Sequence, residues 1–288
     1  MDTSLSNQPK LAVVVVSYHP DPDELATNVA SYADVADWLL VWDNSEQPTD
    51  LTQLCNLFPE AVIMQEGKNR GLAYVYNQAM QLALREGCSH LMTMDQDSLF
   101  ENCAGYWQRA KELTTDPKIG IFCPAVNHNV KKEGPLYNCT TQSGSIFSIS
   151  MLQAIGGFRE DLFIGMVDAE IGLKALQHGY LIYQLPVANI VHHIGSERST
   201  RILGKSVSVS DYSPLRHYYD SRNRILLWYE FPGDYSLQGK LHHLTGRMKV
   251  IAKILASENN KWAKVRAIVS GTYYGLLNRA KPYKQISS

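Results

Sequence analysis

LAVVVVSY (residues 11–18) is an uninterrupted apolar run that is rich in valine. Such a run is typical of a strand buried on both faces, as the strands of parallel sheets are. Three more apolar runs follow at 37–45, 61–67 and 89–95, and residues 19–33 and 69–87, after the first and third of the four runs, have helical features. Strands that alternate with helices predict βαβ crossovers, and therefore an α/β fold with a mostly parallel sheet flanked by helices.

The rest of the chain is less regular. Residues 120–126 and 143–150 read as two more strands, and 168–180 as a helix that ends at Gly179. Glycine accepts the left-handed backbone that often stops a helix. Residues 181–195 return as extended chain. Beyond residue 213, three segments have the periodicity of amphipathic helices, namely 215–231, 237–256 and 261–281.

The composition is that of an ordinary globular protein. The chain has 288 residues, of which 45% are hydrophobic and 19% charged, and its net charge is −1. This balance does not suggest a nucleic-acid partner. The charge is unevenly spread, however, because from Arg216 onward 13 Lys and Arg face four Asp and Glu. The last quarter of the chain is therefore basic.

The five cysteines are scattered, odd in number and never form a CxxC pair. This pattern argues against a disulfide framework and a cysteine zinc site, and it is typical of a reducing compartment. The first residues lack a signal-peptide pattern, and no stretch approaches the roughly 18 apolar residues of a spanning helix. We therefore expect a cytoplasmic protein.

Polar side chains follow successive strands of the predicted sheet. Because the carboxyl ends of parallel strands meet at one edge, where ligands bind in such folds, we expect these side chains to lie close together. Four polar clusters at four strand ends are more than loops alone require. The clusters are Ser17-Tyr18-His19, Asp43-Asn44, Asn69-Arg70-Gly71 and Asp95-Gln96-Asp97.

The stretch CSHLMTMDQDSLF (88–100) places Asp95 and Asp97 at the mouth of a buried strand, separated only by Gln96. Two carboxylates this close repel each other unless a positive group lies beside them. Asp-x-Asp after a buried strand is the pattern of a pair that holds Mg²⁺ or Mn²⁺ with help from substrate phosphates. A solvated turn is the alternative reading.

Two later features favour the metal. His192-His193 closes a strand about one hundred residues on, where a ring nitrogen could complete the metal shell, although a hydrogen-bonded histidine is equally compatible. Asp168 and Glu170 open a helix, where acids complement the helix dipole. Beside a metal-bound diphosphate, such an acid could also serve as general base toward an acceptor hydroxyl.

Taken in order, these motifs resemble the family-2 inverting glycosyltransferases of GT-A fold, and among them the bacterial rhamnosyltransferases of cell-wall and O-antigen assembly. The matching segments are SYxPD, DNS, NxGLAxxxN, MDQDS, SGSxxS, GGF with FxxxxDxE, and HHxG. PLRHYYDSRNRILL (214–227) resembles the stretch that follows the catalytic part of these enzymes. The resemblance covers about residues 10 to 230, and it implies a Rossmann-like catalytic domain with a C-terminal helical extension.

The resemblance implies that a nucleotide-sugar donor lies along the strand ends, with its base and ribose near the first clusters. The nucleotide-binding residues would be Ser17, Tyr18, His19, Asp43, Asn44, Asn69, Gly71, Asn77, Asp95 and Gln96. Arg216 and Arg222 would hold the diphosphate, since arginine suits phosphate. Ser143 and Gly144 would lie on the acceptor side.

The resemblance also implies a divalent metal, Mg²⁺ or Mn²⁺, as cofactor. Its ligands would be Asp97 and Asp95, with His192 as a third ligand and His193 next in line. Asp168 would be the catalytic base, and Glu170 is the alternative. An inverting transfer needs one such carboxylate, because no covalent intermediate forms.

The sequence departs from the family pattern in two places. Gly165 stands where rhamnosyl-type members often carry an acid, and Lys174 stands where arginine is usual. Acceptor contacts are therefore in doubt at the first position, and a bidentate role is weakened at the second.

Motif coverage divides the chain into a disordered N-terminus (1–9), a catalytic domain (10–212) and a basic helical extension (213–288). Within the catalytic domain, the nucleotide-binding half is about 10–100 and the acceptor half about 101–212. A basic amphipathic helix often lies on an anionic membrane face, so 238–288 predicts a peripheral contact with the cytoplasmic membrane. Packing on the catalytic domain is equally compatible, and a homodimer is a further candidate.

Rival functions are less well supported. A phosphatase of the haloacid-dehalogenase type also uses DxD after an apolar run, but Leu99 replaces its usual Thr or Val, and three strands precede it. A silent nucleotide-sugar binder conflicts with the intact acids and His192. Nucleotidyltransferases need a Gly-rich N-terminal phosphate loop, which is absent from this sequence. The donor could instead be a UDP-sugar carrying galactofuranose, N-acetylglucosamine, galactose or glucose.

Overall fold

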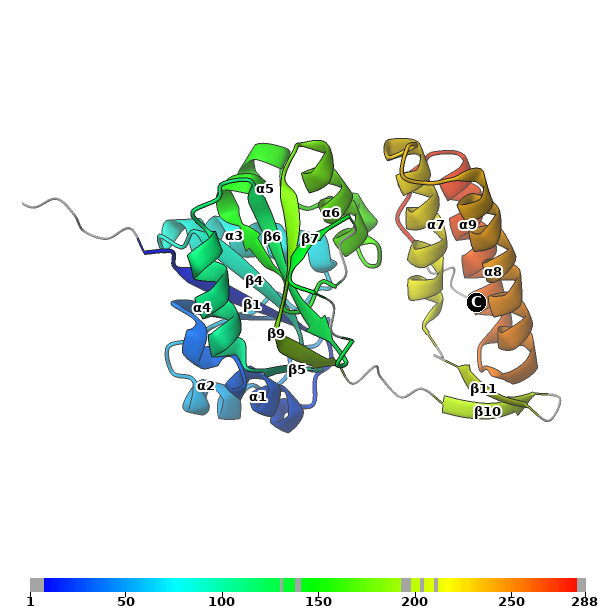
Figure 1. The fold of residues 1–288 in the computed structure, drawn as a ribbon. Coiled ribbons are helices and arrows are strands. Elements are labelled where there is room, and N and C mark those ends of the chain that lie inside the picture. The colour runs from blue at the N-terminus through cyan, green and yellow to red at the C-terminus, as the bar shows by residue number, and fades with distance from the viewer. Residues whose placement is uncertain are drawn as a thin grey trace, which may run out of the picture. The chain divides into compact units, whose positions relative to one another are not determined.

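The computed structural model of the chain describes residues 8–129, 132–137, 141–192, 198–202, 205–209 and 212–283. At 192, 198–202 and 205–209 only the backbone is described. The chain forms two compact units (Figure 1). Unit 1 is Met1–Arg159 with Asp168–His193, and unit 2 is Glu160–Val167 with Ile194–Ser288. The predicted domain boundaries, drawn from motif coverage, stay a prediction.

Unit 1 is built on a mixed nine-stranded sheet. Its parallel part has the order β3-β2-β1-β4, and β8, β6, β9 and β5 continue the path, with β7 paired to β9. The strands are β1 (Leu11–Ser17), β2 (Trp38–Asp43), β3 (Val62–Gln65), β4 (His90–Asp95), β5 (Ser98–Glu101), β6 (Ile119–Val126), β7 (Gly134–Leu136), β8 (Ile146–Ser148) and β9 (Leu181–His192). The predicted α/β class and mostly parallel sheet are confirmed.

Helices cover this sheet, and each predicted helix is present. They are α1 (Pro22–Ala30), α2 (Thr52–Leu57), α3 (Leu72–Arg85), α4 (Cys103–Leu113), α5 (Ile149–Ile155) and α6 (Val167–Gln177), with a 3₁₀ turn at Ala33–Val35. Asp21 caps α1, its Oδ1 accepting from the backbone N–H of Asp23 and Glu24. Sequence reasoning missed α2, α4 and β5, which are short or carry no distinct apolar period.

Strand β1 lies at the centre of the core. Leu11, Val13 and Val15 join a cluster with residues of α1, α2 and α4. The alternate residues Ala12 and Val14 are also fully buried. Successive strand residues point to opposite faces of a sheet, so β1 is covered on both sides, as its valine run predicts.

The described residues of unit 2 form three helices, a hairpin and a 3₁₀ turn at Glu160–Leu162. The helices are α7 (Pro214–Glu230), α8 (Leu237–Ser257) and α9 (Lys261–Leu276), and β10 (Arg198–Ile202) pairs antiparallel with β11 (Lys205–Val209). No helix in the described part of the chain is long and apolar enough to cross a membrane.

Helices α7 and α9 approach each other closely at two glycines of α9. A Cβ atom on Gly271 would lie 2.3 Å from the Tyr218 carbonyl oxygen, and one on Gly275 would lie 3.0 Å from the Arg222 carbonyl oxygen. Both obstacles are backbone atoms, so a side chain there would force the helices apart.

We expect Gly271→Ala to lower the free energy of unfolding by about 1–3 kcal/mol, because α9 must move away from α7. Gly246 in α8 is the matched control, since a Cβ there meets nothing within 4 Å. Gly246→Ala should stabilise the chain by about 0.5–1 kcal/mol through helix propensity. Urea unfolding followed by circular dichroism measures both, and equal effects of the two variants would contradict this packing.

Candidate functional site

Strand register brings the predicted polar clusters to one edge of unit 1. Ser17 of β1 pairs with Asp43 of β2, and Val16 pairs with Asp95 of β4. Asp43 in turn pairs with Gln65 at the end of β3. The carboxyl ends of these four parallel strands therefore lie side by side, as the sequence predicts.

The loops after β1 and β4 are joined through Gln96. The backbone N–H of Tyr18 donates to Gln96 Oε1 at 2.6 Å, and Asn28 Nδ2 donates to the Gln96 carbonyl oxygen at 2.8 Å. Gln96 therefore has its side-chain oxygen and its carbonyl engaged inside the protein. Its predicted contact with the nucleotide stays a prediction, and in this geometry it positions both loops.

Glu46 belongs to this edge, and sequence reasoning missed it. The Tyr18 hydroxyl donates to Glu46 Oε1 at 3.4 Å, and His19 Nε2 lies 3.3 Å from Glu46 Oε2. Burial, and then the charge of Glu46, raise the pKa of Tyr18. The signal was its place three residues after Asp43, in the loop of the second cluster.

Asp43 organises the loop that follows β2. Its Oδ1 accepts from the N–H and the hydroxyl of Ser45, and its Oδ2 accepts from the N–H of Thr49 and from Gln65 Nε2. Burial by itself raises the pKa of Asp43, but these hydrogen bonds outweigh burial and the pKa is lowered. The carboxylate is thus ionised and accepts hydrogen bonds from its own loop and from Gln65, and its predicted contact with base and ribose stays a prediction.

Asn44 and Asn69 link the loops after β2 and β3. Asn44 Nδ2 donates to Asn69 Oδ1 at 3.1 Å, while Asn44 Oδ1 accepts from the N–H of Arg70 at 2.8 Å. Asn69 Oδ1 also accepts from the N–H of Gly71 at 3.0 Å. Gly71 has a φ of +79° at the start of α3, a left-handed backbone that favours glycine.

The carboxylate pair and the histidine strand meet through β5. Directly after Asp97, Ser98 of β5 pairs with His192 of β9. This register puts the backbone of His192 beside the Asp-x-Asp turn, although the two positions are about one hundred residues apart. The side chain of His192 and all of His193 lie outside the described residues, so their metal role stays a prediction.

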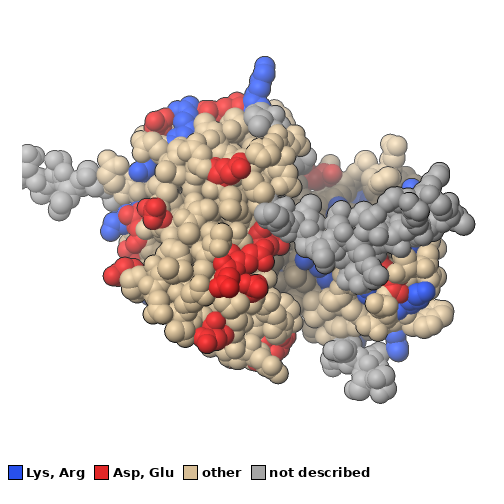
Figure 2. Space-filling view, turned by 90° about the horizontal axis from the view of Figure 1, so that it is seen from below, with Lys and Arg blue, Asp and Glu red and all other residues tan. Residues whose placement is uncertain are grey.

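Asp95 and Asp97 lie at an open, acidic edge. The N–H of Asp95 donates to Ser143 Oγ at 3.2 Å. A hollow of about 20 Å³ beside Asp97 is also lined by Asp21 and Glu24, and Figure 2 shows acidic side chains gathered on the visible face of unit 1. Among the described side chains no three His, Cys, Asp or Glu form a metal-ligand group. A donor set of hard carboxylate oxygens with an excess of negative charge nevertheless suits Mg²⁺ or Mn²⁺.

Ser143 and Gly144 are hydrogen-bonded to the backbone at the end of β4. Ser143 is buried, and the N–H of Gly144 donates to the Thr93 carbonyl oxygen at 2.8 Å. Gly144 has a φ of +77°, and a Cβ there would lie 2.7 Å from Ile190 Cδ1. Both residues therefore fix the end of β4. Their acceptor-side role stays a prediction.

Asn77 fastens the Gly156-Gly157 turn to α3. Its Nδ2 donates to the Phe158 carbonyl oxygen at 2.9 Å, and its Oδ1 accepts from the N–H of Phe158 at 2.8 Å. A Cβ on Gly157 would come within 2.6 Å of Asn77 Oδ1. This two-way bond holds two segments of unit 1 together, so the predicted effect of Asn77 on a nucleotide pocket would be indirect.

The two candidate bases differ in exposure. Asp168 is partly exposed at the start of α6, whereas Glu170 is completely buried. Lys174 Nζ lies 3.5 Å from Glu170 Oε1 and donates to the Gly157 carbonyl oxygen at 3.0 Å. Asp168 is the more exposed of the two acids, and this favours Asp168 over Glu170 as the base.

Asp95 and Asp168 act on the same buried tyrosine. Burial is the main cause that raises the pKa of Tyr76 in α3, and the charges of Asp95 and then Asp168 raise it further. The sheet edge and the start of α6 therefore share one electrostatic environment in unit 1, as one site would require.

The two candidate arginines lie in unit 2 and differ in their exposure. Arg216 is exposed, with its guanidinium 4.5 Å from the centre of the Tyr212 ring. Arg222 is fully buried and donates to Asn223 Oδ1 and to the carbonyl oxygens of Asp161 and Lys281. A diphosphate would have to displace these acceptors, so the geometry does not support the predicted role of Arg222. Arg216 stays a candidate.

Some known proteins resemble this chain in sequence or in fold. No family model matches the chain. The dTDP-rhamnosyl transferase RfbF of Shigella flexneri is 28% identical over 237 residues, an alignment that covers 74% of this chain and 78% of that protein.

Two solved proteins share the fold. S. aureus TarS aligns with a TM-score of 0.52 and 13% identity, over 92% of this chain and 43% of TarS. GalNAc-T7, solved with UDP, GalNAc and Mn²⁺, aligns with a TM-score of 0.53 and 12% identity, over 75% of this chain and 48% of that chain. The chain thus spans less than half the length of either solved chain. These likenesses confirm the predicted GT-A fold, and RfbF supports the resemblance to rhamnosyltransferases.

Proposed function

We propose that this glycosyltransferase, whose relatives include a rhamnosyltransferase, moves L-rhamnose from dTDP-L-rhamnose with inversion of configuration. The acceptor would be a cell-surface polysaccharide or a lipid-linked saccharide on the cytoplasmic side of the membrane. The observation that carries the site is the pairing of Ser98 with His192, because it joins the carboxylate pair to the histidine strand at the edge where the polar loops converge.

The chemistry follows from the groups at this edge. An acceptor hydroxyl oxygen attacks the anomeric carbon of the donor from the side opposite the diphosphate, and the bond between that carbon and the diphosphate oxygen breaks. Asp168 takes the hydroxyl proton, and the nucleoside diphosphate leaves. A divalent cation held by Asp95, Asp97 and His192 would neutralise charge on the departing diphosphate.

Donor recognition would fall to the loops after β1, β2 and β3. Tyr18 is 45% exposed, and its ring offers a surface on which a base can stack. Asn69 is partly exposed, and its side-chain amide nitrogen offers a donor to a ribose or base. The hollow beside Asp97 is only large enough for about one water molecule. A donor would therefore lie across the open edge rather than in a closed cavity.

Three other functions are alternatives. A UDP-sugar donor would keep the fold and the mechanism, since loops rather than the acid pair choose the base and sugar. A non-catalytic nucleotide-sugar binder, or a phosphatase with Asp95 as nucleophile, would need no role for Asp168. A homodimer is also proposed but has no bearing on the reaction.

A donor screen tests the proposal. The purified chain with Mg²⁺ or Mn²⁺ should release nucleoside diphosphate slowly from dTDP-rhamnose, because water replaces the missing acceptor. Asp97→Ala should reduce this release by at least about a hundredfold if the carboxylate supports the cation. Glu133→Ala, an exposed acid that pairs with Arg109, is the control and should leave release unchanged.

Release from a UDP-sugar alone would overturn the rhamnosyl assignment and keep the mechanism. If neither chelation of the metal nor Asp97→Ala lowers the rate of nucleoside-diphosphate release, the proposed metal site is wrong. A phosphorylated Asp95, trapped after incubation with a phosphate ester, would instead establish the phosphatase.

A further inference from the structure

Helices α8 and α9 each expose a row of large apolar side chains. The rows are Leu241, Met248 and Leu255 on α8, and Trp262, Val269 and Leu276 on α9. Members of each row are seven residues apart, so they lie on one side of their helix. Their exposed fractions run from 42% for Leu255 to 79% for Trp262. Contiguous exposure on this scale marks an interaction surface.

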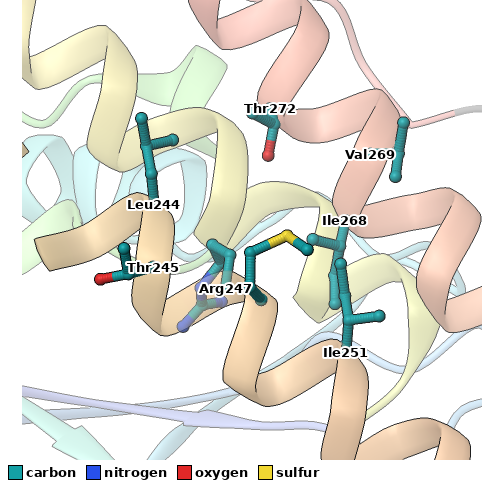
Figure 3. A pocket seen from close by; sticks show the side chains of 8 residues that line it. Leu244, Thr245, Arg247, Ile251, Ile268, Val269 and Thr272 are labelled. Atoms are coloured by element: carbon teal, nitrogen blue, oxygen red, sulfur yellow. The ribbon is translucent and has the colours of Figure 1, made fainter. Parts of the chain in front are cut away.

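A groove joins the two rows into one surface, which we call the apolar face. It encloses about 310 Å³ between α8 and α9, and Figure 3 shows Leu244 and Ile251 of α8 opposite Ile268, Val269 and Thr272 of α9. Met248 and Val269 belong both to the rows and to the groove lining. The apolar face is therefore continuous from one helix to the other.

The charged residues of α8 and α9 are all basic, and the groove-lining Arg247 pairs with Asp220 of α7. Neither α8 nor α9 contains an Asp or Glu. Lys249, Lys253, Lys261 and Arg266 are exposed on these helices. Glu258, between the helices, is buried and accepts from Lys264 Nζ at 2.7 Å, so it adds no exposed negative charge.

We propose that the apolar face of α8 and α9 lies flat on an anionic lipid bilayer, with its apolar rows in the headgroup–acyl boundary and its lysines against lipid phosphates. Amphipathic helices that expose apolar rows and carry only basic charged residues have the chemistry that such a bilayer binds. Trp262 and Tyr273, both exposed on α9, are the side-chain types that settle at this boundary.

Charge decides between a bilayer and a second copy of the chain. A symmetric dimer through the apolar face would bring the basic residues of both copies together, with no Asp or Glu in either helix to offset them. An anionic bilayer supplies the opposite charge. The proposed contact does not depend on the transfer reaction, since it can be measured without donor or acceptor.

Flotation of the full chain with vesicles tests the proposal. Vesicles of phosphatidylcholine with about one-third phosphatidylglycerol should bind the chain at low ionic strength, and pure phosphatidylcholine should bind it much more weakly. Met248→Glu should weaken binding about tenfold or more by placing a charge in the apolar row. Lys249→Ala and Lys253→Ala should weaken it about fivefold each.

Leu57→Glu is the matched control, because Leu57 is an exposed apolar residue of α2 in unit 1. It should float like the unaltered chain, and circular dichroism should show that all variants are folded. Flotation that Met248→Glu leaves unchanged would overturn the proposal. So would absence of flotation at low ionic strength together with a dimer, seen by sedimentation, that Met248→Glu dissociates.

Discussion

Asp168→Asn is expected to lower turnover by about 10²–10⁴-fold, because an amide cannot take the proton of the acceptor hydroxyl. In the structure, the N–H of Ala169 donates to Asp168 Oδ1 at 2.9 Å. Asparagine has the same shape and keeps an oxygen that can accept this hydrogen bond. Donor affinity should therefore stay within about twofold. Single-turnover kinetics with donor and acceptor, and a titration of donor alone, measure the two quantities separately.

Glu170→Gln is the matched control for this result. Glu170 is completely buried beside Lys174, so its change should act on stability more than on the chemical step. Loss of turnover in Glu170→Gln with unchanged melting temperature, and retention of turnover in Asp168→Asn, would assign the base to Glu170. Unchanged turnover in both variants would contradict a carboxylate base on α6.

Arg222→Ala is expected to lower the free energy of unfolding by about 3–5 kcal/mol, through lost volume and unsatisfied carbonyl groups. The guanidinium bridges three segments of unit 2, since it donates to carbonyl oxygens of Asp161 and Lys281 and lies 4.6 Å from the Tyr219 ring centre. Arg222→Lys should recover only part of the loss, because an ammonium lacks the planar fork of donors. Thermal unfolding followed by circular dichroism measures both.

Arg216→Ala provides the control on the same helix. Arg216 is exposed, so its removal should change stability by no more than about 0.5 kcal/mol. If Arg216 holds the diphosphate, the same variant should raise the Kd for donor. An Arg222→Ala variant that is fully stable but binds donor poorly would restore the diphosphate role to Arg222.

The network around Arg222 also reaches the loop before the candidate base. Asn223 Nδ2 donates to the carbonyl oxygens of Leu162, Ile164 and Gly165, all within unit 2. This loop ends at Val167, and Asp168 follows it directly in the chain. Arg222 and Asn223 belong to the stretch 214–227 that resembles a segment of the glycosyltransferases. The structure shows that both side chains hold the loop at 161–165, a role that the sequence alone did not reveal.

The sequence by itself determined the sheet and the edge at which its polar strand ends meet. A valine run with no polar interruption is typical of a strand covered on both faces, and this predicted β1 as a buried strand of a mostly parallel sheet. Polar residues directly after Ser17, Asp43 and Asp95 then had to meet, because parallel strands end at the same edge. These inferences need only local patterns and the handedness of βαβ units.

Only the tertiary structure decided which of the candidates lie open and which are engaged. Glu46 contacts Tyr18 and His19. Asn77 is hydrogen-bonded to Phe158, and β5 pairs with the strand that ends at His192. In each case the partners lie far apart in the sequence. The burial of Glu170 and Arg222 was equally hidden, because the chemistry of a charged residue suggests exposure unless its neighbours in space are known. The sequence shows the chemistry of each side chain, whereas contacts between distant segments decide how exposed that side chain is and which groups it contacts.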